Sequence, residues 1–436
     1  MKLAYDPTSV LVCPLVIAIA FALAPAFPAE NPPASHQQSK ALTLSGAIHI
    51  ALDANPELHA SSGRIDAAAG RAHQAGRWTN PELTLSAEEW PVDGSGGFSD
   101  AKQTIGVAQT IPFLGKKRID RQIGVSGIRN SEAELAVRRL EVVLDVKLAF
   151  FQVLAAERLA TVAGDLVKVA DSLVTTATKR VSAGAATAQE QLRAEIALEQ
   201  ARAELSNFRR DVATARQNLA VQLGRPDLTS VPLAGALAES VNLARFDQVA
   251  EQWLAGHPSV AAANTSVDQA ELELRRARLE PYPDVKMAVS GGQEAESGAS
   301  IIELGIGVPL PIFDRSKGKK QEAQANVRVA ESERVAVEQR LLRDWRTAVQ
   351  RLRTAAEQVG NYRERILPKA NEALGLMQTG FEQGKFGLID LLDTQRTTAE
   401  VRLTYQQKLL ELNAAQAELE ALLGGSPPGK SAKCDP

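Results

Sequence analysis

The side chains best placed to do chemistry in this sequence are carboxylates that follow two glycines. Asp390 and Asp393 come shortly after Gly384, and Glu190 is as far from Gly184 as Asp390 is from Gly384. Where several copies of a chain surround a pore, such acids form a ring that favours cations. The alternative is structural, because the helix dipole stabilises an acid in the first turn of any helix. All three acids are candidates for such a ring.

Other chemical signatures are missing from the sequence. The five histidines share no spacing that would build a metal cage, and three methionines do not form a soft-metal relay. No glycine-rich phosphate loop, nucleophile elbow or His-Glu-x-x-His motif occurs. The 49 basic and 52 acidic residues are spread evenly, so nucleic acid is not an expected partner. We expect no catalytic residue, no cofactor and no metal site, and therefore no enzyme.

The beginning of the chain predicts an exported protein. Lys2 precedes an apolar stretch that ends in small residues, which is typical of a secretory signal peptide. Pro14 and Pro25 disfavour the alternative, an uncleaved membrane anchor. We expect a signal peptide at 1–29 and a flexible N-terminal segment at 30–42. No later apolar run is long enough for a transmembrane helix, so a membrane role would require β-strands.

The rest of the chain is an internal duplication with a shift of about 200 residues. The sequence at 219–224 aligns with that at 419–424, and Asn-Pro-Glu-Leu at 80–83 aligns with Tyr-Pro-Asp-Val at 282–285. The predicted divisions are a first structural repeat at 43–224, a linker at 225–241, a second repeat at 242–424 and a disordered tail at 425–436.

Each repeat contains two segments in which apolar and polar residues alternate, the pattern of a half-buried strand. The predicted strands are 82–90 and 103–111 in the first repeat, and 284–291 and 300–309 in the second. Their lengths suit tilted crossings of an outer membrane. Aromatic residues flank these strands, as they do at membrane interfaces, although they could also cap a soluble sheet. These interfacial candidates are Trp78, Trp90, Phe113, Tyr282 and Phe313.

A long helical hairpin is predicted after each pair of strands, at 116–224 and 315–424. Apolar residues from Leu148 to Leu173 keep heptad spacing, and Pro368 predicts a kink in the second hairpin. Gly184 and Gly384 mark the turns. A helix of about 65 residues measures on the order of 100 Å, far longer than a compact domain needs.

Four membrane strands cannot close within one chain, because an open edge in hydrocarbon leaves backbone groups unpaired. Bacterial barrels begin at about eight strands, so two chains would suffice and three would give twelve. The residues alone do not choose between the two.

Several motifs together resemble the TolC-type outer-membrane efflux channels over nearly the whole mature chain. The Gly-Gly-Lys-Arg turn of the CzcC-like branch, which is associated with heavy-metal cation efflux, is Leu-Gly-Lys-Lys-Arg here, at 114–118. The motifs that resemble the family are Asn-Pro-Glu-Leu at 55–58 and 80–83, Gln-Thr-Ile-Pro-Phe-Leu-Gly-Lys-Lys-Arg at 109–118, Leu-Pro-Ile-Phe-Asp-Arg-Ser at 310–316 and the segment at 381–395.

The resemblance implies a mainly α fold with a small transmembrane β part. Three copies would share a twelve-stranded barrel and a long α-helical periplasmic barrel, in contact with outer-membrane lipid. The implied partners are a periplasmic adaptor (membrane fusion) protein, which would dock at the tips around Gly184 and Gly384, and an inner-membrane pump of the resistance-nodulation-division class. Asp390 and Asp393 match the paired aspartates that constrict the family's periplasmic entrance, while Phe386 stands where some members carry a basic gate residue.

The function implied is passive conduction of heavy-metal cations from the periplasm to the outside. Multidrug efflux or type I protein secretion through the same channel remains an alternative. A second alternative, from a different class, is an exported coiled-coil scaffold or adhesin.

Overall fold

The structure is a computed structural model that describes residues 41–89, 97, 101–247, 252–294 and 297–424. The predicted signal peptide, most of the N-terminal segment, Trp90 and the tail lie outside the described residues. Everything below concerns the unit that begins at Ala41.

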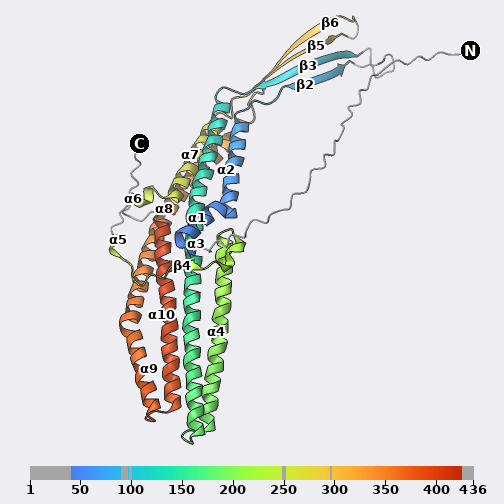
Figure 1. The fold of residues 1–436 in the computed structure, drawn as a ribbon. Coiled ribbons are helices and arrows are strands. Elements are labelled where there is room, and N and C mark those ends of the chain that lie inside the picture. Colours follow the sequence, from blue (N-terminus) through green and yellow to red (C-terminus); the bar gives the residue numbers. More distant parts are fainter. Residues whose placement is uncertain (1–40, 90–96, 98–100, 248–251, 295–296, 425–436) are drawn as a thin grey trace, which may run out of the picture. The chain divides into compact units, whose positions relative to one another are not determined.

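The two repeats share one plan, in which helices are followed by two strands and then by a long helical hairpin (Figure 1). The first contains α1 (Leu44–Ala54), α2 (Pro56–Ala75), β2 (Glu82–Glu88), β3 (Lys102–Ile111), α3 (Lys116–Ser182) and α4 (Ala188–Gln222). The second contains α5 (Ala244–Asp247), α6 (Gln252–Ala255), α7 (Pro258–Arg278), β5 (Val285–Gln293), β6 (Ser300–Gly307), α8 (Lys317–Asn361), η3 (Tyr362–Ile366), α9 (Leu367–Glu382) and α10 (Leu388–Leu422). Between them lie η2 (Pro226–Ser230) and β4 (Leu233–Ala234), which pairs in parallel with β1 (Leu42–Thr43).

The four longer strands form one antiparallel sheet in the order β2-β3-β5-β6. Strands β2 and β6 are therefore the outer strands. Leu85 and Ile105 are paired and both exposed, and Leu304 on β6 is 81% exposed. A single chain thus leaves apolar side chains of its sheet uncovered. None of the helices in the described part of the chain is both long and apolar enough to cross a membrane.

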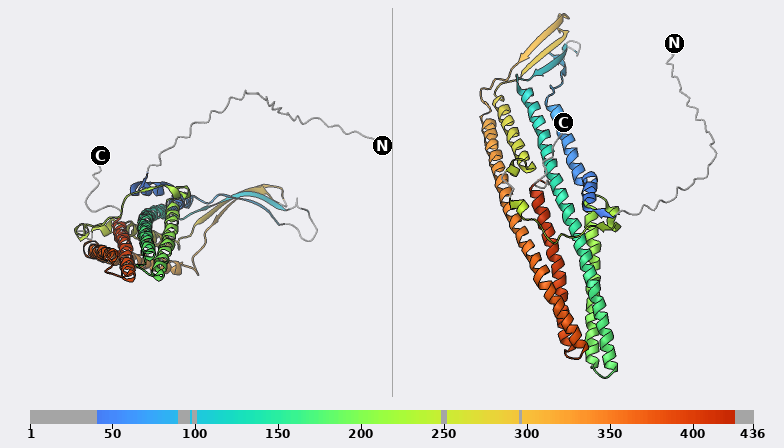
Figure 2. Two further views of the ribbon diagram at one scale, coloured as in Figure 1. Left: turned by 60° about the horizontal axis from the view of Figure 1, so that its bottom comes forward. Right: turned by 60° about the vertical axis from the view of Figure 1, so that its left-hand side comes forward.

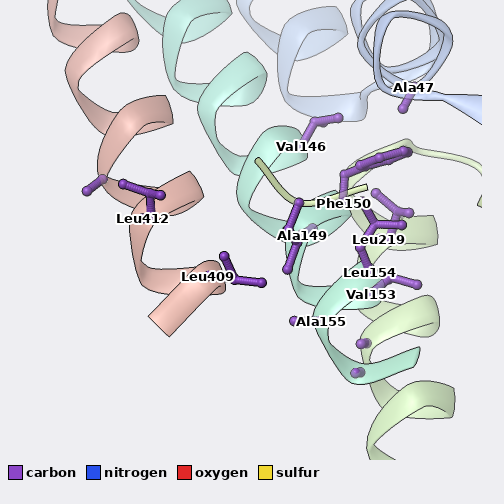
Figure 3. Close-up of a cluster of buried hydrophobic side chains, with 14 of the residues drawn as sticks. Ala47, Val146, Ala149, Phe150, Val153, Leu154, Ala155, Leu219, Leu409 and Leu412 are labelled. Carbon is purple, nitrogen blue, oxygen red and sulfur yellow. The ribbon is translucent and has the colours of Figure 1, made fainter. Parts of the chain in front are cut away.

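The long helices extend from the sheet to two turns at the opposite end of this unit (Figures 1 and 2). Helix α3 lies at the centre, because it packs against α2, α4, α7 and α10. Its fully buried Phe150 and Val153 belong to the main hydrophobic core, to which α10 contributes Leu409 and Leu412 (Figure 3). In the heptad seam of α3, Leu173 is buried but Leu159 and Leu166 are only half-buried, and Leu166 lines an open groove between α3, α4 and α10.

The counterpart of α3 in the second repeat is interrupted by the π-helical turn η3, just before Pro368. Proline has no N–H to donate to the carbonyl of Glu364, so regular α-helical hydrogen bonding fails there. The N–H of Leu367 instead donates to the carbonyl of Tyr362, which is π-helical spacing. The sequence predicts a kink at Pro368, and the structure has a π-helical turn at Tyr362–Ile366, about one turn before it.

Candidate functional site at the helical tips

The two helical hairpins end in turns of the same geometry. Gly184 and Gly384 adopt left-handed backbone conformations, with φ of 73° and 72°. Each follows a long helix, and the next N–H closes a Schellman-type bond: Ala185 donates to Arg180 and Lys385 to Gly380, both at 2.8 Å. The identical chemistry explains why the two turns align in the sequence.

The helices that leave these turns are capped differently. In the first repeat Thr187 Oγ1 accepts a bond from the N–H of Glu190 at 3.3 Å. In the second repeat the cap residue is Gly387, which has no side chain, and Asp390 Oδ2 accepts from the Gly387 N–H at 3.3 Å. Asp390 therefore caps the start of α10, as an acid in the first turn of a helix can do whatever the function of the protein. Its side chain remains exposed.

Asp393 lies one turn further along α10 and forms an ion pair with Arg396 at 2.8 Å. Both side chains are well exposed, so this pair contributes little to stability. Asp393 also lines a groove of about 990 Å³ between α3, α4 and α10, whereas Asp390 and Glu190 do not line it. The described residues contain no cluster of three or more potential ligands able to hold a metal. One chain therefore does not bring the three acids together into a binding site.

Phe386 packs against its own hairpin. A Cβ atom built on Gly380 would lie 2.2 Å from Cδ2 of Phe386, so the ring occupies the space that a side chain at position 380 would need. In the sequence, Phe386 is notable only because some family members carry a basic residue at this position. Its packing against Gly380 becomes visible only in the structure.

A second contact links the two hairpins to each other. Arg180, near the end of α3, donates from Nη1 to the carbonyl of Phe381 at 3.2 Å. Its guanidinium also lies 4.6 Å from the centroid of the Phe381 ring. Phe381 is buried in a separate apolar cluster at the tips, which joins α3 and α4 to α9 and α10. Sequence reasoning missed this contact, because it joins residues in different repeats.

The predicted interfacial aromatics lie where strands meet helices. Phe113 and Tyr282 are stacked, with ring centroids 4.7 Å apart. Trp78 and Phe313 are 57% and 100% exposed, as side chains that face another molecule would be.

The basic turn after β3 contains a buried lysine. Lys116 is 6% exposed, and its Nζ lies 2.9 Å from Oδ1 of Asp284, which also accepts from the Phe113 N–H. The pairing with Asp284 makes it possible to bury this ammonium group, because a buried charge is tolerated only with a partner.

A second ion-pair network connects the nearby helix ends. Arg276 lies 2.7 Å from Asp120 and 2.6 Å from Glu280, and Lys319 lies 2.8 Å from Glu280. Hydrogen bonds from Lys319 and Arg276 hold the pKa of Glu280 below its ordinary value. The network ties the start of α3 and the start of α8 to the end of α7.

Comparison with known proteins identifies the architecture. The model of the family described as outer membrane efflux protein matches residues 47–225 and 249–425. The cobalt-zinc-cadmium resistance protein CzcC of Cupriavidus metallidurans is 27% identical, over 95% of this chain and 99% of that protein. The pyoverdine export outer membrane protein OpmQ of Pseudomonas aeruginosa is 22% identical, over 88% and 85%. The outer membrane protein VceC of Vibrio cholerae superimposes with a TM-score of 0.72 at 20% identity, over 87% of this chain and 96% of that one.

Proposed function

Because the chain belongs to the outer membrane efflux protein family, we propose that it is the passive duct of a tripartite efflux system that carries heavy-metal cations out of the periplasm. The protein is an outer-membrane channel and not an enzyme, with a large helical periplasmic part. The family match spans both repeats, which an unrelated coiled-coil scaffold or adhesin would not explain.

The uncovered surfaces of one chain support assembly into a trimer. The outer strands β2 and β6 each offer one free edge, and backbone groups in hydrocarbon must find partners. Helix α4 packs mainly on α3, and its Leu192 and Ile196 are 58% and 57% exposed. Neighbouring copies would cover both surfaces.

The exposed carboxylate of Asp390 at the helical tip carries the proposal of a cation pathway. Three copies would place Asp390, Asp393 and Glu190 around one axis, and such a ring favours cations over anions. The name of the relative CzcC points to cobalt, zinc and cadmium as cargo. The helical-tip turns at Gly184 and Gly384 are our candidate docking surface for the periplasmic adaptor, which would connect the duct to an inner-membrane pump.

Export of an organic molecule is the second candidate, because the relative OpmQ is named for pyoverdine export. The two candidate cargoes require different properties of the channel. Cation selectivity depends on the carboxylates, whereas a large organic molecule depends on the width of the opening.

The test is single-channel recording of the purified trimer in a planar bilayer with a salt gradient. Asp390→Asn should shift the reversal potential towards that of a non-selective pore, and Asp393→Asn should add to the shift. Asp211→Asn, which removes one exposed carboxylate from α4 outside the candidate gate, is the matched control. If Asp390→Asn and Asp211→Asn behave alike, the tip acids do not select cations.

Growth of a deletion strain on cobalt, zinc or cadmium then separates the two cargo classes. Complementation by the wild-type chain on these metals would support metal export, and its failure with the Asp390→Asn variant would show that the tip carboxylate is needed. Failure of the wild-type chain itself to complement would favour the organic cargo.

A further inference from the structure

The end of one helix meets the start of another in each repeat, and in the first repeat this junction is closed. Asn55 caps α2 and also donates from Nδ2 to the carbonyl of Gln222, in the last turn of α4, at 2.9 Å. A Cβ atom on Gly224 would lie 2.3 Å from the carbonyl oxygen of Ala54. The two helix ends are therefore in direct contact.

The second repeat replaces the capping asparagine with His257, and its junction is open. His257 Nδ1 accepts from the Ser259 N–H at 3.1 Å, so a neutral ring carries its proton on Nε2. That Nε2 makes no hydrogen bond to another described residue, and the residue as a whole is 6% exposed. A Cβ atom on Gly424, the counterpart of Gly224, would have no atom of the described residues within 4 Å.

A cavity of about 380 Å³ lies at this open junction, and His257 forms part of its lining. This volume lies within the range of small-molecule sites, which is about 300–1,000 Å³. The charged lining consists of Glu141, Asp344 and Glu418 with a single guanidinium, that of Arg351, 3.6 Å from Glu418. Arg138 and Arg343 pair with Glu141 and Asp344 but do not line the cavity. Its apolar lining is formed by Val137, Leu140, Leu144, Leu341, Ala348, Ala421 and Leu422.

We propose that this cavity binds a small organic cation that has an apolar body and a hydroxyl group. The carboxylates would pair with the cationic group, and the leucines would cover the apolar body. The hydroxyl oxygen would accept a hydrogen bond from the Nε2–H of His257. The buried imidazole stays neutral, since burial lowers the pKa of His257, and it therefore does not repel the cation. The site is separate from the tip acids, so the inference does not depend on the cargo of the duct.

Calorimetric titration of the purified trimer with three probes of the same shape tests the proposal. These probes are 2-amino-1-phenylethanol, which is a cation at pH 7, the neutral 1-phenyl-1,2-ethanediol, and the anion mandelate. We expect the cation to bind about tenfold more tightly than the diol, the ratio that corresponds to about 1.4 kcal/mol. Mandelate should not bind. Equal affinity for all three probes would overturn the proposal.

Variants locate the binding. The double variant Glu141→Gln with Asp344→Asn should weaken the cation about tenfold and leave the diol unchanged, while Glu411→Gln, an exposed acid of α10 outside the cavity, should change neither. His257→Asn restores the cap of the first repeat and should weaken binding severalfold. Ala421→Phe should abolish binding by filling the cavity. Unchanged affinity in the double variant, with the trimer intact by size-exclusion chromatography, would show that the cation binds elsewhere.

Discussion

The guanidinium of Arg180 lies 4.6 Å from the ring centroid of Phe381 and donates a hydrogen bond to the carbonyl of the same residue. One side chain of the first hairpin thus contacts both the ring and the backbone of the second. The counterpart of Arg180 at a shift of 200 is Gly380, so the duplicated sequence is asymmetric at this contact. The contact joins the two hairpins within one chain.

Replacing Arg180 should loosen the tips. Arg180→Met keeps the aliphatic part of the side chain and removes the cation, and should cost about 0.5–1 kcal/mol of local stability. We expect a higher mean single-channel conductance, because the hairpins separate more easily. Arg202→Met, an exposed arginine of α4, is the control. A conductance no different from that of Arg202→Met would show that the contact does not restrain the tips.

Gly380→Ala should displace the Phe386 ring, because the added methyl group would lie 2.2 Å from Cδ2. If ring displacement is the cause, Phe386→Ala should give the same change in open probability, and the double variant should resemble Phe386→Ala alone. Gly375→Ala on the same helix adds a methyl group into open space and should have no such effect. Additive effects of Gly380→Ala and Phe386→Ala would contradict the packing explanation.

His257 predicts a loss of stability in mild acid. Its pKa in the folded protein is lowered by burial, so the unfolded chain binds more protons than the folded chain as pH falls below about 6.5. Stability therefore decreases from neutral pH towards pH 5. Thermal unfolding of the trimer at pH 7.5 and 5.5 measures this, and His257→Asn should reduce the difference. If the His257→Asn variant loses as much stability in mild acid as the wild-type protein, groups other than His257 cause the loss.

The ion-pair network at Glu280 predicts a second, more acidic transition. The pKa of Glu280 is lowered in the folded protein, so its contribution is complete above about pH 4.5 and is lost as pH falls through the folded value. Glu280→Gln should lower the temperature of trimer dissociation in sodium dodecyl sulfate at pH 7, and this difference should shrink as the pH falls below about 4.5. Glu271→Gln, whose carboxylate is half-exposed and 3.6 Å from Arg275, should have little effect at either pH.

Most elements of the fold could be predicted from local patterns in the sequence. Alternation of apolar residues identified four strands, and the structure places the second of them at Lys102–Ile111. The glycines at 184 and 384 predicted the hairpin turns, since only glycine adopts a left-handed conformation without strain. Such signals depend on neighbours along the chain, and they can be seen without knowing what lies across from them.

The contacts around the candidate sites depend instead on residues far apart in the sequence. Lys116 is buried because Asp284 of the other repeat lies beside it, and Phe381 is held by Arg180. The duplication predicts the same junction in both repeats, yet the asparagine junction is closed and the histidine junction encloses a cavity. The sequence by itself thus determined the repeats, strands, turns and tip carboxylates, because local backbone preferences set them. Only the tertiary structure decided which charges are paired and which junction stays open, because packing between distant segments controls both.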